Sequence, residues 1–254
     1  MSDEDRSRVD CHVKILDERV VRRAKRAGLD AIVYAPHFTR IRDIRARADR
    51  FSDEELTVVP AREVFTGSWR ERKHVLAIGL TDPVPDFITL EAAMAEFERQ
   101  DAVVLAPHPE FATVSLEEAD LREYRELIDG IETYNPKHLP SHNRRARQLA
   151  TDLELAPFTS SYAHLPRTVG VAHTEFDAAV ESEADLIAAL AGGGPRRVVH
   201  LTGPRRWGTT VAELAHLCWE NSWQKVDRLV FSDTEATHPD QAPYEGRFDD
   251  VSVY

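Results

Sequence analysis

Short apolar runs alternate along this chain with longer segments in which apolar side chains recur every three or four positions. The short runs predict buried strands, and the periodic segments predict helices that cover them. Helices are expected over residues 17–28, 41–51, 90–100, 116–128, 141–152, 184–191 and 210–223. Strands are expected within the runs 9–12, 31–37, 57–63, 74–80, 102–106, 130–134, 156–161 and 197–201. Such alternation predicts parallel strands joined by right-handed helical crossovers.

Five apolar runs end in a histidine or a glutamate, namely His12, His37, Glu63, His108 and His164. The C-terminal ends of parallel strands meet on one face of barrels and doubly wound folds, and that face carries the active site. Imidazole and carboxylate groups are ligands of zinc, manganese and iron. The recurrence therefore predicts a metal centre at this face.

Length and composition are those of a globular protein with one large domain, or with a domain and an extension. The chain has 254 residues, of which 42% are hydrophobic and 30% are charged, so it can bury a substantial core. It contains no apolar run of about eighteen residues and no basic leader followed by an apolar segment, which predicts a cytoplasmic protein without a membrane segment. Cys11 and Cys218 do not make a disulfide framework.

The charge balance argues against one class of binding partner. The formal net charge is -12, which argues against binding to a nucleic-acid duplex because that requires a basic surface. Lysine occurs only at positions 14, 25, 73, 137 and 225. An acidic, lysine-poor surface is typical of a protein that stays hydrated in concentrated salt, so we expect a halophilic archaeal source.

Several segments resemble motifs of the polymerase and histidinol phosphatase (PHP) family. The first strand resembles the family's D-x-H-x-H strand, the segment ending at His37 its G-L-D-x-I-x-x-T-D-H segment, and later segments its A-H-P, G-I-E-x-Y-N and G-S-D-A-H motifs. The matching positions lie at residues 9–14, 28–37, 63, 74, 106–109, 130–135 and 160–170. The resemblance implies an α/β fold, a distorted (β/α)7 TIM-like barrel over residues 1–202. Residues 203–254 would add a C-terminal helix and an irregular extension packed on the barrel.

The resemblance also implies metal ligands and a reaction. Glu63, His74 and His108 would form one metal site, and Glu63 would bridge to a second site that includes His12. A third site would include His37 and His164, either of which would also assist proton transfer. The family holds up to three divalent ions and hydrolyses phosphoesters, for which adjacent ions clamp the attacking and leaving oxygens. The ligand types admit Zn, Mn or Fe.

Three positions depart from the family pattern. Lys14 replaces a histidine, and Pro36 and Tyr162 replace aspartates, so we expect one or two ions and not three. Lys14 has three interpretations: an ammonium in a metal position that supplies charge to a phosphate or to Glu63, a carboxylated lysine that ligates metal, or a Lys–Glu pair in a dead site. If the metal position is merely vacant, as in the last interpretation, Lys14→His should raise the number of metal ions bound per chain.

Substrate contacts are predicted near these ligands. Arg62 and Arg167 are candidates to hold a phosphate with a forked guanidinium. Asn135 follows the strand at 130–134, and Glu132 is either a substrate-side group or a structural carboxylate.

Three functional interpretations follow from the sequence. The first is a metal-dependent phosphoesterase acting on a small phosphorylated or nucleotide substrate. The second is a non-catalytic barrel that serves as a partner or regulatory subunit and docks through its C-terminal tail at residues 244–254. The third is a subunit of an RNA-processing assembly, which the acidity disfavours for direct RNA contact.

Overall fold

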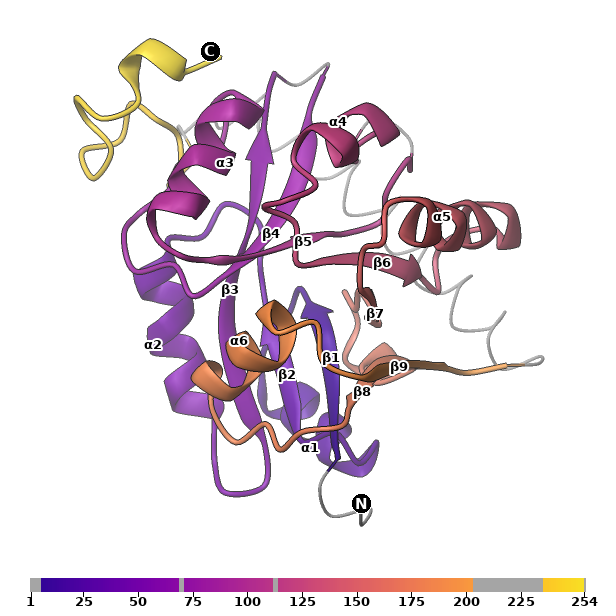
Figure 1. The fold of residues 1–254 in the computed structure, drawn as a ribbon. Helices are drawn as coiled ribbons and strands as arrows, with labels where there is room; N and C mark the ends of the chain where they lie inside the picture. Colours follow the sequence, from indigo (N-terminus) through magenta and orange to yellow (C-terminus); the bar gives the residue numbers. More distant parts are fainter. Residues whose placement is uncertain (1–5, 69–70, 112–113, 203–234, 254) are drawn as a thin grey trace.

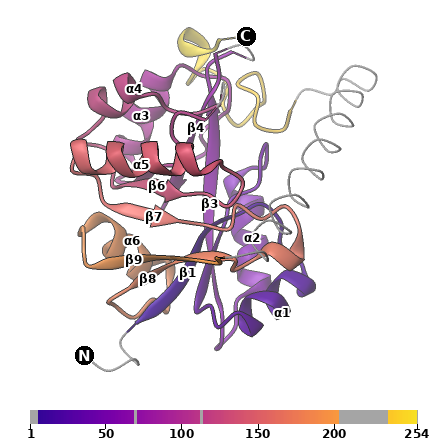
Figure 2. The same ribbon diagram turned by 90° about the vertical axis from the view of Figure 1, so that its right-hand side faces the viewer.

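The computed structural model describes residues 6–68, 71–111, 114–202 and 235–253. Its strands are β1 (Ser7–Val13), β2 (Ala31–Tyr34), β3 (Thr57–Thr66), β4 (Lys73–Ile78), β5 (Val103–Ala106), β6 (Gly130–Tyr134), β7 (Pro157–Thr159), β8 (Ala172–Phe176) and β9 (Arg196–His200). Its α-helices are α1 (Glu18–Arg26), α2 (Ile41–Phe51), α3 (Leu90–Arg99), α4 (Glu118–Glu123), α5 (Pro140–Asp152) and α6 (Glu183–Ala191). The strands form one sheet in the order β7-β6-β5-β4-β3-β2-β1-β8-β9 (Figures 1 and 2).

The sheet curls until its two ends meet. The Lys14 backbone N–H donates to the Ala163 carbonyl at 3.0 Å, which joins the chain after β7 to the end of β1. The Thr159 N–H donates to the Thr174 hydroxyl at 2.9 Å, which joins β7 to β8. These contacts nearly close the sheet into a distorted barrel, and the expected fold class is confirmed.

Strand direction differs from the all-parallel expectation at β4 and β8. β4 runs antiparallel to both β3 and β5, and β8 runs antiparallel to both β1 and β9. Residues 67–72 between β3 and β4 are too few for the crossover that a parallel pair requires, so this connection is a hairpin. β8 was not predicted because its sequence, AHTEF, has no continuous apolar run.

Most of the predicted helices are present with similar ends. α2 has the expected bounds, and Asp17 caps α1 by accepting from the N–H groups of Arg19 and Val20. α4 is shorter than the predicted helix at 116–128. The predicted helix at 210–223 lies outside the described residues.

Apolar side chains fill the barrel and the layers around it. Inside, residues such as Leu76, Leu105 and Phe158 pack with Leu186 and Leu190 of α6. Outside, one cluster lies under α1 and α2, and another lies under α3, α4 and α5. None of the helices in the described part of the chain is both long and apolar enough to cross a membrane.

The C-terminal segment at residues 235–253 packs on the barrel beside α3 (Figure 1). Tyr244 and Phe248 are buried in the outer cluster under that helix. The Thr89 N–H donates to the Val251 carbonyl at 3.0 Å. The segment is irregular, with turns and one short 3-10 helix (Asp249–Val251).

Candidate metal centre

The barrel brings Glu63 and His74 together because β3 and β4 run in opposite directions. Ala61, two positions before Glu63 on β3, packs inside the barrel, so Glu63 also points inward. His74 is the second residue of β4 and pairs with Phe65. Since β4 is reversed, its beginning lies at the barrel end where β3 finishes, and His74 is a diagonal neighbour of Glu63.

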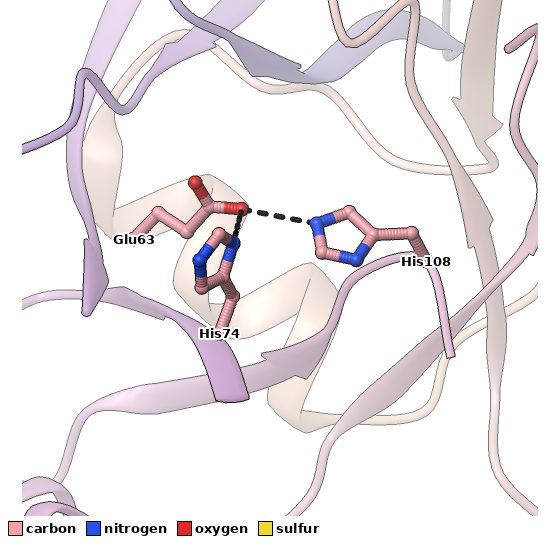
Figure 3. Close-up of side chains that lie close together, drawn as sticks. All are labelled: Glu63, His74 and His108. Carbon is pink, nitrogen blue, oxygen red and sulfur yellow. Dashed lines mark hydrogen bonds and ion pairs between the residues drawn. The ribbon is translucent and has the colours of Figure 1, made fainter. Parts of the chain in front are cut away.

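One oxygen of Glu63 faces three imidazoles. Oε1 lies 3.2 Å from His108 Nε2, 3.4 Å from His74 Nδ1 and 3.6 Å from His12 Nε2. Figure 3 shows His74 and His108 turned toward this oxygen. The ligand atoms of Glu63, His74 and His108 all lie within 4.8 Å of one another, and the three residues are buried. This group can hold a divalent metal ion.

The other oxygen of Glu63 faces a lysine and a fourth histidine. Oε2 contacts the Lys14 ammonium and lies 3.1 Å from His37 Nδ1. Lys14 Nζ also donates to the Ala35 carbonyl at 2.9 Å. The His37 side chain is 31% exposed, whereas that of Glu63 is fully buried. His37 is therefore the member of this group that is open to solvent.

A break in strand register on β1 turns His12 and Lys14 toward Glu63. Val9 and Cys11 pack inside the barrel, but Val13 packs in the outer cluster with α1. The pairing of β1 with β2 shifts between Asp10 and Val13. Such irregularities re-aim side chains beside active sites. Here the shift directs the side chains of His12 and Lys14 into the centre.

The hydrogen bonds of His108 determine which ring nitrogen carries the proton and which presents a lone pair to Glu63. Nδ1 lies 3.0 Å from the Ser115 hydroxyl, which itself donates to the Phe111 carbonyl at 3.0 Å. Because that hydroxyl proton is used, Nδ1 carries the imidazole proton and donates it to Ser115. Nε2 is then an acceptor, 3.2 Å from another acceptor, Glu63 Oε1.

The imidazoles of His12 and His74 complete the argument for a cation. Neither ring nitrogen of either residue has a hydrogen-bond partner in the part of the chain that the structure describes, although both residues are buried. Buried polar atoms without partners are costly. Lone pairs of this kind, converging on a carboxylate, are stabilised by a positive ion among them. The donor set therefore fits Zn, Mn or Fe.

Charge and burial hold these groups in the protonation states that ligands need. Burial, reinforced by the Lys14 ammonium, holds the pKa of His12 and that of His37 well below the usual value. Burial would raise the pKa of Glu63, but Lys14 and the neighbouring histidines together outweigh it, and the pKa lies well below its usual value. Burial lowers the pKa of Lys14, and Glu63 opposes that shift. The imidazoles of His12 and His37 are therefore neutral beside an ionised carboxylate.

His164 lies beside this group and is held by a different lysine. Its Nδ1 lies 2.7 Å from Lys137 Nζ, which also donates to the Tyr162 carbonyl. The ring of Tyr162 packs against both His12 and His164, with its centroid 4.9 Å from that of His12 and 5.1 Å from that of His164. Burial and then the Lys137 charge hold the pKa of His164 well below its usual value. Lys137 was not among the predicted site residues, although it follows a strand end in a lysine-poor chain.

Glu132 and Asn135 lie behind the centre and are fully engaged. The Glu132 carboxylate accepts from the His108 backbone N–H at 2.8 Å, from Asn135 Nδ2 at 2.9 Å and from Ser160 Oγ at 2.7 Å. His108 has a φ of 32°, a left-handed conformation that residues other than glycine rarely adopt. The Glu132 bond holds this backbone conformation, so Glu132 positions His108.

The two predicted arginines lie in different surroundings. Arg62 is the neighbour of Glu63 on β3 and points to the opposite, outer face, where it donates to Asp86 at 2.9 Å and to the Thr39 carbonyl at 2.9 Å. The structure therefore does not bring Arg62 to the centre. Arg167 is exposed in the short 3-10 helix Pro166–Thr168, three residues after His164.

Known proteins are similar to part of this sequence and to its fold. A family model described as PHP-associated matches residues 140–194, which is less than half of the chain. No curated protein matches the sequence. PsfC from Pseudomonas syringae PB-5123 is similar in structure with a TM-score of 0.62, at 19% identity, over 84% of this chain and 98% of PsfC. The lesion-specific endonuclease PfuEndoQ from Pyrococcus furiosus is similar with a TM-score of 0.56, at 14% identity, over 76% of this chain and 57% of its own. At these identities the likeness is one of fold.

Proposed function

We propose that this chain is a metal-dependent hydrolase that cleaves phosphoesters in small phosphorylated or nucleotide substrates. The observation that carries the proposal is the convergence of three buried imidazoles on Glu63 Oε1, two of them without a hydrogen-bond partner among the described residues. The similarity in fold to an endonuclease, which acts on phosphodiesters, supports the same class of reaction.

Glu63, His74 and His108 would hold the ion, with His12 as a further nitrogen ligand. A divalent ion bound there supplies Lewis acidity for a phosphoryl group and its attacking water. Glu132 and Ser115 keep His108 in place, the first through its backbone N–H and the second through Nδ1. Such supporting bonds orient a ligand and set its tautomer.

His37 and His164 are suited to move protons. His37 directs Nδ1 toward Glu63 and is partly exposed, so the neutral ring with its proton on Nδ1 has Nε2 available as a base. His164 Nδ1 lies 2.7 Å from Lys137 Nζ and 3.1 Å from the Tyr162 carbonyl, so the ring is held in place beside the centre, where it can take part in proton transfer. The exposed Arg167 guanidinium, close in sequence to His164, can hold a substrate phosphate.

The test combines metal analysis with hydrolysis of phosphomonoester and phosphodiester substrates in added Mn or Zn. We expect the wild-type protein to bind metal and to turn over at least one substrate class. Glu63→Gln and His108→Ala should lose both properties, while Glu98→Gln, on an exposed glutamate of α3, should keep both. A folded wild-type protein that turns over no substrate would favour the partner or regulatory interpretation.

A further inference from the structure

The Glu63 carboxylate divides the centre into two unlike halves. On the Oε1 side are nitrogen atoms of three histidines, which are ligands for a metal. On the Oε2 side a positive charge is already present, because the Lys14 ammonium contacts this oxygen. With a metal ion on Oε1, Glu63 would bridge two cations, one of which would be the protein's own ammonium.

The surroundings of Lys14 are those of a cation position. Its side chain is 3% exposed, and its ammonium is bound by the Glu63 carboxylate and by the Ala35 carbonyl at 2.9 Å. The ring centroid of Tyr162 lies 5.5 Å from Nζ, which is within range of a cation–π contact. Carboxylate and carbonyl oxygens are also donors that a divalent ion would use.

These contacts distinguish between a structural and a substrate-binding role for Lys14. An ammonium has three donors; Glu63 and Ala35 occupy two of them, and the Tyr162 ring covers the group from another side. A buried lysine engaged in this way is not free to contact a substrate phosphate. Its charge acts on Glu63, so Lys14 is a positioning residue.

We propose that the Lys14 ammonium occupies one of the two cation positions on Glu63, so that this centre is built from one divalent ion and one lysine. A second ion held by Glu63 Oε2 and the Ala35 carbonyl would have to displace the ammonium, because Lys14 Nζ already occupies the space between these two oxygens. The inference rests on the proposed metal binding at Glu63, and it specifies the number of ions. It also accounts for how Oε1 is held toward the histidines when only one ion is bound.

The test is the metal stoichiometry of Lys14→His, measured by elemental analysis after Mn(II) loading and by the EPR spectrum of the bound Mn(II). An imidazole at position 14 supplies a neutral ligand where the ammonium lies, so a second ion can bind to Oε2. We expect one ion in the wild-type protein, two in Lys14→His with a spin-coupled spectrum, and one in the control Lys25→His. Lys25 is a surface lysine paired with Asp53 and Glu55.

The other outcomes are decisive as well. Two ions in the wild-type protein overturn the proposal, and a mass increase of one carboxyl group on Lys14 would then identify it as a carboxylated ligand. One ion in both the wild-type protein and Lys14→His also overturns it, because the lysine would not be what limits the count. No ion in either protein contradicts the proposed function itself. If Lys14→His does not fold, Lys14→Gln takes its place in the same measurements, since it removes the charge and offers a neutral amide oxygen as a ligand; two ions are expected in it, and one ion would overturn the proposal.

Discussion

Glu63 organises the centre because each of its oxygens meets a different kind of partner. Its Oε1 faces histidines whose lone pairs need a cation, and its Oε2 is neutralised by Lys14. The lysine charge and the neighbouring histidines together hold the pKa of this buried carboxylate well below its usual value. The tautomer of His108, set by Ser115, directs Nε2 toward the same point. Single hydrogen bonds behind the ligands should therefore affect metal affinity.

Ser115→Ala should weaken metal binding about 10- to 100-fold, because loss of the Nδ1 partner frees the His108 ring to rotate and to change tautomer. The measurement is the dissociation constant of Zn or Mn by competition with a chelator. Ser141→Ala, on an exposed serine of α5, is the matched control and should leave the affinity unchanged. Equal affinities for wild type and Ser115→Ala would show that this hydroxyl does not support the site.

At the scale of elements, the C-terminal segment is bound to the strand that carries Glu63. Arg62 and Asp86 form a buried ion pair on the outer face of β3, with side chains 1% and 0% exposed. The Thr237 hydroxyl donates to the same carboxylate. Asp86 also accepts from the Phe65 N–H at 2.7 Å. The Asp86 carboxylate, in the loop between β4 and α3, thus connects β3 to the C-terminal segment at residues 235–253.

Asp86→Ala should lower the free energy of unfolding by about 3–5 kcal/mol, since it leaves the Arg62 guanidinium buried without a counter-charge. Asp82→Ala is the comparison, because Asp82 pairs with Arg99 at the surface and should cost at most about 1 kcal/mol. Urea unfolding at neutral pH measures both. Similar small losses in the two variants would mean that the buried pair is solvated or dispensable.

A second connection joins the C-terminal segment at residues 235–253 to α3, and its contribution to stability depends on pH. Glu96 of α3 binds Arg99 and, at 3.0 Å, Arg247 of the tail. Burial would raise the pKa of Glu96, but the bond with Arg99 and its neighbours lowers it below the usual value. A lowered pKa in the folded state means that the stabilisation is complete above the unfolded pKa, near 4.3, and is lost as the pH falls through the folded pKa.

Glu96→Gln should therefore cost about 1 kcal/mol of unfolding free energy at pH about 7, and the difference from wild type should shrink below pH about 4. Urea unfolding across this range measures the difference, with Glu98→Gln as an exposed glutamate control on the same helix. A difference that stays constant down to the lowest pH would exclude an ionised Glu96 as its source.

The sequence predicted most elements and the residues around Glu63, but not how they are arranged. Periodicity located α2 and α3 closely because each has a clear apolar stripe. It could not show that β4 is reversed, which is what brings His74 to the centre, since strand direction depends on pairing with β3. Alternation along the predicted strand at 57–63 already puts Arg62 and Glu63 on opposite faces, so the prediction of Arg62 as a phosphate contact failed because it depended on nearness in sequence alone. Ser115 and Lys137 carry no motif, and only the folded chain places them against His108 and His164.

At the scale of the whole molecule, the net charge of -12 is a source of self-repulsion. At low ionic strength this repulsion opposes the compact state. Salt near 1 M shortens the screening length to about 3 Å and removes most of the effect between exposed charges. The metal centre is buried and is screened much less, so salt should act on stability and not on the geometry of the site.

We therefore expect the melting temperature to rise between about 0.1 M and about 2 M KCl, as for a protein adapted to concentrated salt. Thermal unfolding followed by circular dichroism at the two concentrations measures this, with metal content checked in each sample. A melting temperature that falls as KCl increases would contradict the halophilic interpretation of the composition.

The most direct test of the central claim is anomalous diffraction from crystals of the wild-type protein loaded with Zn or Mn. The predicted result is one anomalous peak bounded by Glu63 Oε1, His74 and His108, with Lys14 still in contact with Glu63 Oε2. A metal-loaded crystal with no peak at this position would contradict the account, because these lone pairs would then converge on the carboxylate without a cation.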